Sequence, residues 1–287
     1  MKSKAISQER FESIAADLRE AYGMGPDGLR AIAAVIAPPI YDEIKQKEIA
    51  TLLLAEHKLP KGEPARYNKV REIKAFWIGA GGQVHQSNMD ESEIEFPIDR
   101  VASNPAVDVS VLRNGDVYRL TDMEKWAGSA IRKKLNERTV SVISAAVPES
   151  NIVEVAGTAL TEDALHQAIS ILEDKDLSLK YIVMRGGRFN DIRSWDLDPV
   201  TDRELREKGI VKYYSGAQVL LTAASKAEEV LLIPDEEIGK FAVRAQIAVE
   251  ADNRPSEFKV GWVVWMEVAH GVLRPDLTAK VKILGHG

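Results

Sequence analysis

The sequence contains no cysteine, and this absence alone excludes several kinds of protein. Disulfide frameworks, thiolate zinc sites, iron–sulfur clusters and cysteine nucleophiles all need a residue that the chain lacks. Long apolar runs are missing too. The longest, residues 31–40 and 260–266, fall far short of the ~20 residues of a membrane-spanning helix. The first residues also lack the apolar segment and cleavage site of a secretory signal. We therefore expect a soluble, folded, cytosolic protein without a membrane partner.

The chain has only a small excess of negative over positive charge. The chain of 287 residues has 38 lysines and arginines against 44 aspartates and glutamates, for a net charge of −6. This mild acidity argues against a dedicated nucleic-acid binder, which would concentrate basic residues on one face. Hydrophobic residues make up 45% of the chain, and this content excludes a disordered protein. A chain of this length can bury a real hydrophobic core.

The first 60 residues carry helical patterns. A first helix, with Ser7 as its N-cap, is predicted by an apolar stripe at helical spacing. The stripe consists of Phe11, Ile14, Ala15, Leu18 and Tyr22. A second helix over residues 29–36 should end at Pro38 and Pro39, because proline lacks the N–H that continues a helix. A third is expected over residues 41–56. Their apolar faces are narrow, so we expect these helices to lie on another part of the structure.

A long hairpin should follow the helices. Residues 70–78 and 93–101 have strand patterns, and they flank a polar stretch that begins with the glycine-rich residues 79–82. Two strands alone bury little, so this hairpin should project or be donated to a neighbouring chain. Alternating valines then predict one more short strand at Val107, Val109 and Val111.

The longest helix is expected from Thr121 to just before Pro148. Thr121 and Glu124 have the spacing of a capping box at the helix start. Its apolar stripe comprises Met123, Trp126, Ala127, Ala130, Ile131, Leu135, Val142, Ile143 and Ala146. Arg132 falls on the predicted polar side, where alanine should be tolerated. A helix of this length suggests a structural spine.

An α/β region and a series of strands complete the chain. Thr161 should cap a helix that carries Leu165 and Leu172, and residues 181–184 should form a buried strand. Short helices are predicted at residues 189–195 and 201–208. Further strands are predicted at residues 218–222, 230–233, 241–250, 259–268 and 279–284. Trp262 and Trp265 are three apart in a strand and should face opposite sides.

No catalytic, metal or cofactor site can be assembled from the sequence. Residues 79–82 lack the spacing of a phosphate-binding loop, and no histidine has a second ligand at metal spacing. The acids at residues 235–237 follow a proline and indicate a turn with solvated charges. The same interpretation applies to Asp196 and Asp198. The stretch from Arg185 to Arg188 could hold an anion, but it is more simply a turn from a strand into a helix.

The order of these elements resembles the major capsid proteins of tailed bacteriophages, whose Hong Kong 97-type fold is shared with encapsulin shells. The last third carries the resemblance most clearly, in residues 230–246, 259–267 and 276–283. The long helix at residues 121–147 is similar to the spine helix of that family. The stretch 181–193 is similar to the strand and helix of its axial domain.

This resemblance implies an α+β fold with four parts. Residues 1–60 would form an N-terminal helical arm, and residues 61–104 an extended loop. Residues 105–150 and 228–287 would form a peripheral domain that holds the spine helix, and residues 151–227 an α/β axial domain. The short arm departs from family members that begin with a long scaffolding segment. Scaffolding should then be a separate protein or absent.

The implied function is that of a non-enzymatic capsid protein that self-assembles into pentamers and hexamers of an icosahedral virus head. Such a head encloses double-stranded DNA without sequence-specific contact, and its partners include a portal and scaffolding or decoration proteins. The protein would be made in the host cytoplasm and reside in the virion. One alternative is an encapsulin-type compartment that holds cargo enzymes. A weaker alternative is an α/β enzyme with its site at residues 185–195.

Some members of this family cross-link their subunits by isopeptide bonds between lysine and asparagine, assisted by a buried glutamate. Lys69 or Lys74, Asn253 and Glu257 have the residue types for this reaction. Spacing alone does not bring them together, so we assign no site residues.

Overall fold

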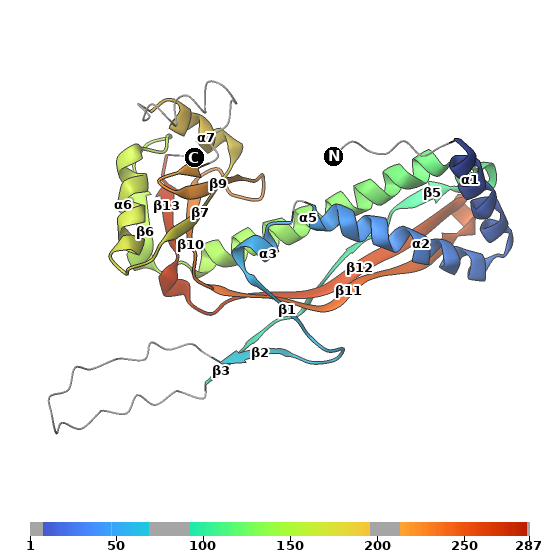
Figure 1. Cartoon of the computed structure of the whole chain (residues 1–287), viewed down its shortest axis with the longest axis horizontal. Coiled ribbons are helices and arrows are strands. Elements are labelled where there is room, and N and C mark those ends of the chain that lie inside the picture. Colours follow the sequence, from blue (N-terminus) through green and yellow to red (C-terminus); the bar gives the residue numbers. More distant parts are fainter. Residues whose placement is uncertain (1–7, 47, 69–91, 196–212, 286–287) are drawn as a thin grey trace. The chain divides into compact units, whose positions relative to one another are not determined.

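The computed structural model describes residues 8–46, 48–68, 92–195 and 213–285 (Figure 1). These residues form helices and several sheets, as expected of an α+β protein. The chain divides into two compact units. Unit 1 comprises Met1–Leu52, Asp99–Arg138 and Val243–Val268. Unit 2 comprises Leu53–Ile98, Thr139–Ala242 and Ala269–Gly287.

Two long strands organise the sheet of unit 1. They are β11 (Gly239–Arg254) and β12 (Lys259–Val272); the short strand β1 (Ala55–Lys58) belongs to unit 2. On its other side, β12 pairs antiparallel with β4 (Asp99–Ser103) and β5 (Ala106–Asp108). Both short strands keep one register along β12, so they form a single interrupted edge of the sheet.

Alternation along β12 separates an apolar face from a polar one. Trp262, Val264, Met266 and Val268 are buried, and the indole Nε1 of Trp262 donates a hydrogen bond to the carbonyl of Leu29 at 3.4 Å. The intervening Trp265 faces the other way. The guanidinium of Arg100 lies 4.4 Å from its ring centre. The prediction that the two tryptophans face opposite sides is confirmed.

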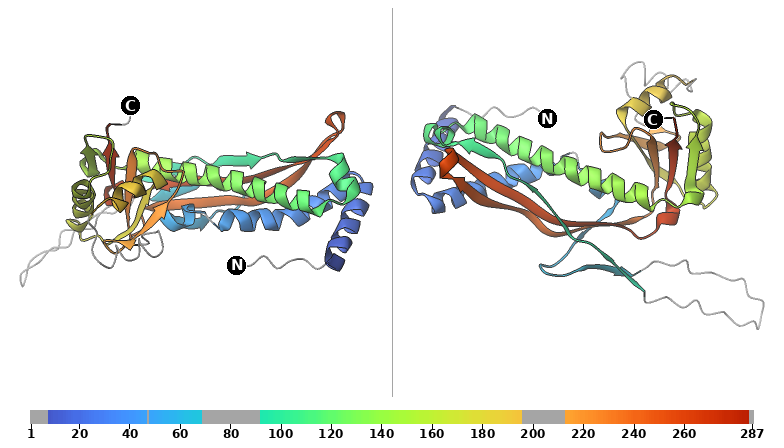
Figure 2. Two further views of the ribbon diagram at one scale, coloured as in Figure 1. Left: turned by 90° about the horizontal axis from the view of Figure 1, so that it is seen from above. Right: turned by 180° about the vertical axis from the view of Figure 1, so that it is seen from behind.

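The buried face of this sheet is covered by α2 (Pro26–Lys45), which follows α1 (Gln8–Gly23) (Figures 1 and 2). The prediction that a helix ends at Pro38 and Pro39 is wrong, because α2 continues through both prolines. The reason is its apolar stripe at four-residue spacing, which tertiary packing holds in place. The stripe consists of Ile32, Ile36, Ile40 and Ile44, all buried. Burial of several isoleucines, each contributing about 1.5–3 kcal/mol, outweighs the backbone hydrogen bonds that the prolines remove.

The third predicted helix, over residues 41–56, is also wrong. Helix α2 ends at Lys45, and only the four-residue α3 (Ala50–Leu53) precedes strand β1. The first predicted helix is confirmed as α1, although Ser7 lies outside the described residues.

The expected hairpin is described at its base. Strand β2 (Ala65–Asn68) pairs antiparallel with β3 (Glu93–Phe96). The predicted strand over residues 93–101 is wrong as one element, because it is interrupted at Pro97 and Ile98 into β3 and β4, which join different sheets. Proline cannot donate to a strand ladder, which explains the break. The other predicted arm, residues 70–78, and its tip at residues 79–82 lie outside the described residues.

Phe96 anchors the base of this hairpin within unit 2. Its ring packs in a small core with Leu59, Ala65, Ala242 and Ala269. It lies directly against Gly271, where an added Cβ would fall within 2.1–2.2 Å of ring atoms. Only glycine leaves room for the ring at that position. The hairpin is therefore held at its base by packing in its own chain.

Two predicted element boundaries, the end of the valine strand and the start of the long helix, are wrong for the same local reason, an aspartate cap. The valine strand ends at Asp108, whose carboxylate accepts a hydrogen bond from the Ser110 amide at 2.8 Å and begins α4 (Val109–Asn114). The long helix α5 (Val117–Ala146) begins four residues before Thr121, because the Asp116 carboxylate accepts from the Arg119 amide at 3.2 Å. The Thr121 hydroxyl instead donates to the carbonyl of Val117.

The predicted face of α5 is correct at its centre and wrong at its edge. Met123, Ala127, Ile131, Leu135 and Ile143 are buried as expected. Trp126, however, is 73% exposed, and Ala130 is exposed as well.

Close packing against α2 explains why the buried face of α5 is rotated away from Trp126 and Ala130. A Cβ on Gly128 would lie within 2.9–3.0 Å of Glu43 and the Ile40 carbonyl, so α2 touches α5 on the side of Gly128 and Arg132. The Arg132 side chain is only 13% exposed, and it binds the Glu43 carboxylate and carbonyl, each at 2.6 Å. Its predicted solvent-facing position is therefore wrong.

Unit 2 is built on a mixed sheet with strands in the order β6–β13–β10–β7–β9–β8. The strands are β6 (Ile152–Val155), β13 (Ala279–Ile283), β10 (Glu229–Pro234), β7 (Leu179–Met184), β9 (Ala217–Leu221) and β8 (Tyr213–Tyr214). Helix α6 (Glu162–Glu173) packs on β6 and β13, and α7 (Gly186–Arg193) follows β7. Single turns of 3-10 helix occur at Glu149–Asn151, Pro255–Glu257 and Pro275–Leu277. The strands and helices predicted here are confirmed, including the Thr161 cap; residues 201–208 lie outside the described residues.

We predict that Arg132→Ala lowers the free energy of unfolding by roughly 1–3 kcal/mol, because it leaves the half-buried Glu43 carboxylate and its carbonyl without this donor. The matched control is Arg138→Ala on the same helix. Arg138 and its partner Asp99 are both about half exposed, so this change should cost at most ~0.5 kcal/mol. Urea unfolding of both variants measures the difference. Equal losses would show that the Arg132 pair is no more important than a surface pair.

Candidate functional site

The acidic cluster at residues 235–237 is a set of three separate ion pairs. Its carboxylates lie 2.5 Å from Lys180, 2.8 Å from Arg274 and 2.6 Å from Lys240. Because each carboxylate has its own cation, the cluster does not converge on a metal position. Across the described residues, no group of three or more histidines and acids could hold a metal ion. Asp196 and Asp198 lie outside that part of the chain.

The turn from Arg185 to Arg188 leads from β7 into α7, as the simpler interpretation predicted. The Arg188 guanidinium is buried, and it donates to the carbonyls of Ala227 and Thr158 and to the Asp191 carboxylate. These bonds tie three segments of unit 2 together. Arg188 is therefore occupied in holding the fold, and of the two arginines at this turn only Arg185 is exposed.

The described histidines make local contacts. His57 lies 2.8 Å from the Tyr67 hydroxyl, and His166 lies 3.1 Å from the Tyr214 hydroxyl. His270 is buried against the ring of Phe241.

No described helix is long and apolar enough to cross a lipid bilayer.

Most of the residues considered for cross-linking lie outside the part of the chain that the structure describes. Lys69, Lys74 and the side chain of Asn253 lie outside the described part of the chain. Glu257 is 49% exposed and lies 3.7 Å from Lys259. An isopeptide bond at these residues stays a prediction.

Unit 2 holds a buried charge cluster that serves the fold. The Ser144 hydroxyl donates to the Glu229 carboxylate at 2.6 Å, and Lys280 donates to the Ser144 carbonyl at 3.0 Å. Burial alone would raise the pKa of Glu229. The hydrogen bond from Ser144 and the charges of Lys280 and Lys226 outweigh burial, so the pKa lies below its usual value. Glu229 therefore stays ionised and paired, and it has no free position for a ligand.

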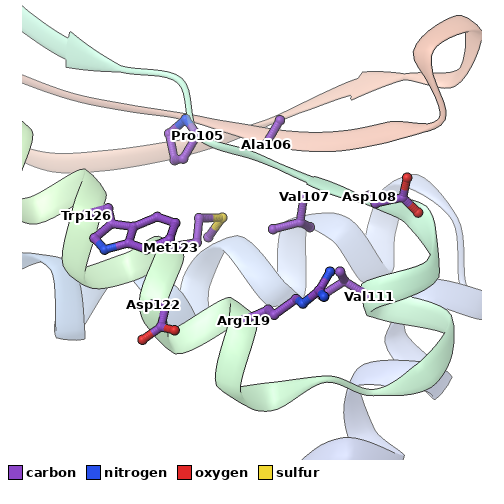
Figure 3. A pocket seen from close by; sticks show the side chains of 9 residues that line it. All are labelled: Pro105, Ala106, Val107, Asp108, Val111, Arg119, Asp122, Met123 and Trp126. Atoms are coloured by element: carbon purple, nitrogen blue, oxygen red, sulfur yellow. The ribbon is translucent and has the colours of Figure 1, made fainter.

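A hollow in the surface of unit 1 lies between β5 and α5 (Figure 3). It is an open groove of about 590 Å³. The side chains of Pro105 and Val107 point toward it from the strand, and those of Met123 and Trp126 from the helix. Met123 is buried and forms the floor, whereas Trp126 is 73% exposed. An exposed tryptophan beside an apolar groove is typical of a surface that contacts another chain.

Charges of both signs surround this groove. Asp108, Arg119 and Asp122 line its rim, and all three are exposed. The hydrogen bonds that Asp108 accepts at the start of α4 lower the pKa of its carboxyl group, so it is ionised at neutral pH. The arrangement offers an apolar contact with a polar rim, which is the usual anatomy of a protein interface.

The groove does not follow from the sequence pattern, because the apolar stripe of the long helix assigns Trp126 to the core. One signal could have corrected the assignment: Asp122 and Ala130, one turn to either side, share the face of Trp126. An aspartate on that face indicates solvent. The groove itself depends on β5, and sequence spacing does not place that strand beside the helix.

Glu124 lies on the opposite side of α5 from this groove. It is half-buried, one turn before Gly128, where α2 approaches most closely. Burial raises the pKa of its carboxyl group to about 7, and the neighbouring Lys125 opposes this rise only weakly. An acid with this pKa changes its charge near neutral pH.

Glu124 should make unit 1 less stable as the pH rises. Its pKa is raised in the folded state, so its contribution is fully present below about pH 4.5 and is lost as the pH rises through about 7. We predict that Glu124→Gln stabilises the protein by roughly 1–3 kcal/mol at pH 8 and has little effect at pH 4.5. Thermal melting at the two pH values measures this. A gain of the same size at both would contradict the titration.

Comparisons by sequence find no relative. No protein-family model matches the chain, and no curated protein matches it.

Comparison with solved structures does find similar folds. The virus-like particle from Pyrococcus furiosus has 13% sequence identity and a TM-score of 0.60, and the match covers 87% of this chain and 98% of that one. The mature capsid of bacteriophage PhiM1 has 12% identity and a TM-score of 0.62, over 84% and 88%. A chain of Microbacterium phage Oxtober96 has 12% identity and a TM-score of 0.64, over 83% and 92%. The chain thus has the α+β Hong Kong 97-type fold that its pattern of elements resembles.

Proposed function

We propose that this protein is the subunit of a shell, a major capsid protein that self-assembles into an icosahedral virus head enclosing double-stranded DNA. The observation that carries the proposal is the fold. It extends over more than four fifths of the chain and is shared with the mature capsid of bacteriophage PhiM1 and the capsid of cyanophage P-SCSP1u. The proposed role is structural, and the subunit performs it through the surfaces that contact other subunits.

The surface of unit 1 supports self-assembly. The groove between β5 and α5, called here the Trp126 groove, exposes an apolar contact surface. Phe258 is 73% exposed at the turn between β11 and β12. Exposed aromatic side chains are favourable anchors for subunit contacts. The net charge of −6 suits a container for DNA, because a basic lining would bind the phosphate backbone strongly.

The parts of the subunit and its partners follow from the same proposal. Residues 1–60 act as an arm and residues 61–104 as an extended loop. Residues 105–150 and part of 228–287 form the peripheral domain, and residues 151–227 the axial domain. Strands β10 and β13, from the expected peripheral range, belong with the axial domain, because they pair in one sheet with β6 and β7. Pentamers and hexamers assemble with a portal and with separate scaffolding or decoration proteins. The protein is made in the host cytoplasm and remains in the virion.

A second candidate function is an encapsulin-type shell around cargo enzymes. The observation in its favour is the Pyrococcus furiosus virus-like particle, of which 98% is covered. The enzyme alternative, at residues 185–195, has less support. At that turn Arg188 is buried and bonded to three segments of its own chain, which leaves Arg185 as the exposed charge.

The purified protein should assemble into closed shells, which sedimentation and electron microscopy will detect. For a virus head, the shells made with the other head proteins should protect double-stranded DNA from nuclease. Shells that instead contain a specific co-purified enzyme would support the compartment. A protein that remains a monomer or dimer at every concentration and salt level would contradict both shell functions.

A further inference from the structure

The chain contains a single Asn–Gly dipeptide, Asn114–Gly115, at the end of α4. Asparagine followed by glycine is the pair most prone to spontaneous deamidation, because glycine has no side chain to hinder attack by its own amide nitrogen. Asn114 is exposed to solvent, whereas Gly115 is buried. The chemistry of this dipeptide therefore makes it a candidate modification site, and its burial makes the surroundings of Gly115 decisive.

The modification needs only the chain and water. The amide nitrogen of Gly115 attacks Cγ of Asn114, so that a new C–N bond closes a five-membered succinimide while the bond from Cγ to Nδ2 breaks. The amide proton leaves with Nδ2 as ammonia. Water then opens the ring at one of its two carbonyls, which leaves either aspartate or isoaspartate. The first step requires a Gly115 amide that is free of other bonds.

The fold withholds that amide from the reaction. Gly115 adopts a left-handed conformation, with φ 67° and ψ 41°, and its amide donates to the Leu112 carbonyl at 3.1 Å. The Asp116 amide donates to the Val111 carbonyl at 2.9 Å. This pattern is the Schellman end of a helix. It commits the nucleophile to a hydrogen bond and holds Asn114 in a helical conformation, in which the five-membered ring does not close.

Helix α1 covers this turn. A Cβ added to Gly115 would lie 2.7 Å from the Ala15 carbonyl oxygen and 2.9 Å from Nε of Arg19, so α1 lies directly over the glycine. Helix α4 has only six residues, too few to persist by itself in water. The end of α4 therefore depends on the helix that packs on it.

We propose that Asn114–Gly115 is a latent deamidation site that α1 keeps closed, so that a subunit is modified only when α1 separates from α4. This inference goes beyond the proposed shell function and does not depend on it. The modification is one-way. A carboxylate at the end of α4 is disfavoured by the helix dipole, and isoaspartate lengthens the backbone at the turn into α5. Deamidation thus records each opening of α1 permanently.

The central test compares two substitutions on α1 in the folded protein at mildly alkaline pH. Leu18→Ala removes a buried side chain one turn from Ala15, so the rate of deamidation at Asn114 should rise by at least about tenfold. The matched control is Asp17→Ala at an exposed neighbouring position, which should deamidate as slowly as the wild type. Circular dichroism and melting show that each variant is folded.

Trypsin provides the readout. Cleavage after Arg113 and Arg119 releases residues 114–119 as one peptide, and mass spectrometry follows its deamidation. Wild-type protein unfolded in urea gives the unprotected rate, and the folded wild type should be at least about tenfold slower. Hydrogen exchange at the Gly115 amide should accelerate in Leu18→Ala as well, because both reactions need the same opening.

A milder pair of variants decides the question if Leu18→Ala fails to fold. Ala15→Gly removes the methyl group that lies against Gly115, and Ala16→Gly makes the same change at an exposed position of the same helix. Both changes lower the helix propensity of α1 by the same amount. Ala15→Gly should therefore deamidate roughly fourfold faster than Ala16→Gly, from the loss of one buried methyl group.

Two results would overturn the proposal. Equal rates of deamidation in folded and unfolded wild type would show that the fold does not protect Asn114. Protection that is unchanged in Leu18→Ala, and equal in Ala15→Gly and Ala16→Gly, would show that α1 is not the element responsible. All rates are measured on the purified subunit, so they are independent of the formation of shells.

Discussion

Strand β12 is the element on which unit 1 depends. Its alternation fixes two faces at once, with Trp262, Val264 and Met266 buried on one side and Trp265 and Glu267 on the other. A slip of one residue would exchange these faces, so the register is tightly specified. The same register directs the pairing of β4 and β5. It therefore determines which backbone groups of these two short strands face β12 and which point outward.

Close approach of α2 and α5 sets the remaining surface. Gly128 lets the Glu43 side chain and the Ile40 carbonyl come near, and the Arg132–Glu43 pair then lies between the helices. Helix α5 packs on α2 through its Gly128 side. Trp126, two residues earlier, lies on the opposite side of the helix and is exposed. The apolar groove is thus a consequence of core packing, as is the half-buried position of Glu124.

The sequence was sufficient for elements whose pattern is long and regular. Helices α1 and α6, the buried strand β7, the end of α5 and the two faces of β12 follow from periodicity. The errors occur where a local rule competes with packing or with a cap. Pro38 and Pro39 were overridden by a buried isoleucine stripe, and Asp108 and Asp116 began helices that the apolar pattern placed elsewhere. Trp126 was misplaced because hydrophobicity alone does not reveal which neighbour a helix packs against.

The groove could not be predicted for a more general reason. Its lining residues all lie between Pro105 and Trp126, but their pattern does not show how β5 packs beside α5, because pairing with β12 places that strand. The same reasoning accounts for a fold shared at 11–14% identity with several phage chains. Alternation and packing volume specify the backbone, and many sequences satisfy them. Individual residues matter most where chains meet, because exposed edges and aromatic side chains are not constrained by the core. Under the proposed shell function, the specificity of assembly should therefore reside in exposed residues such as Trp126.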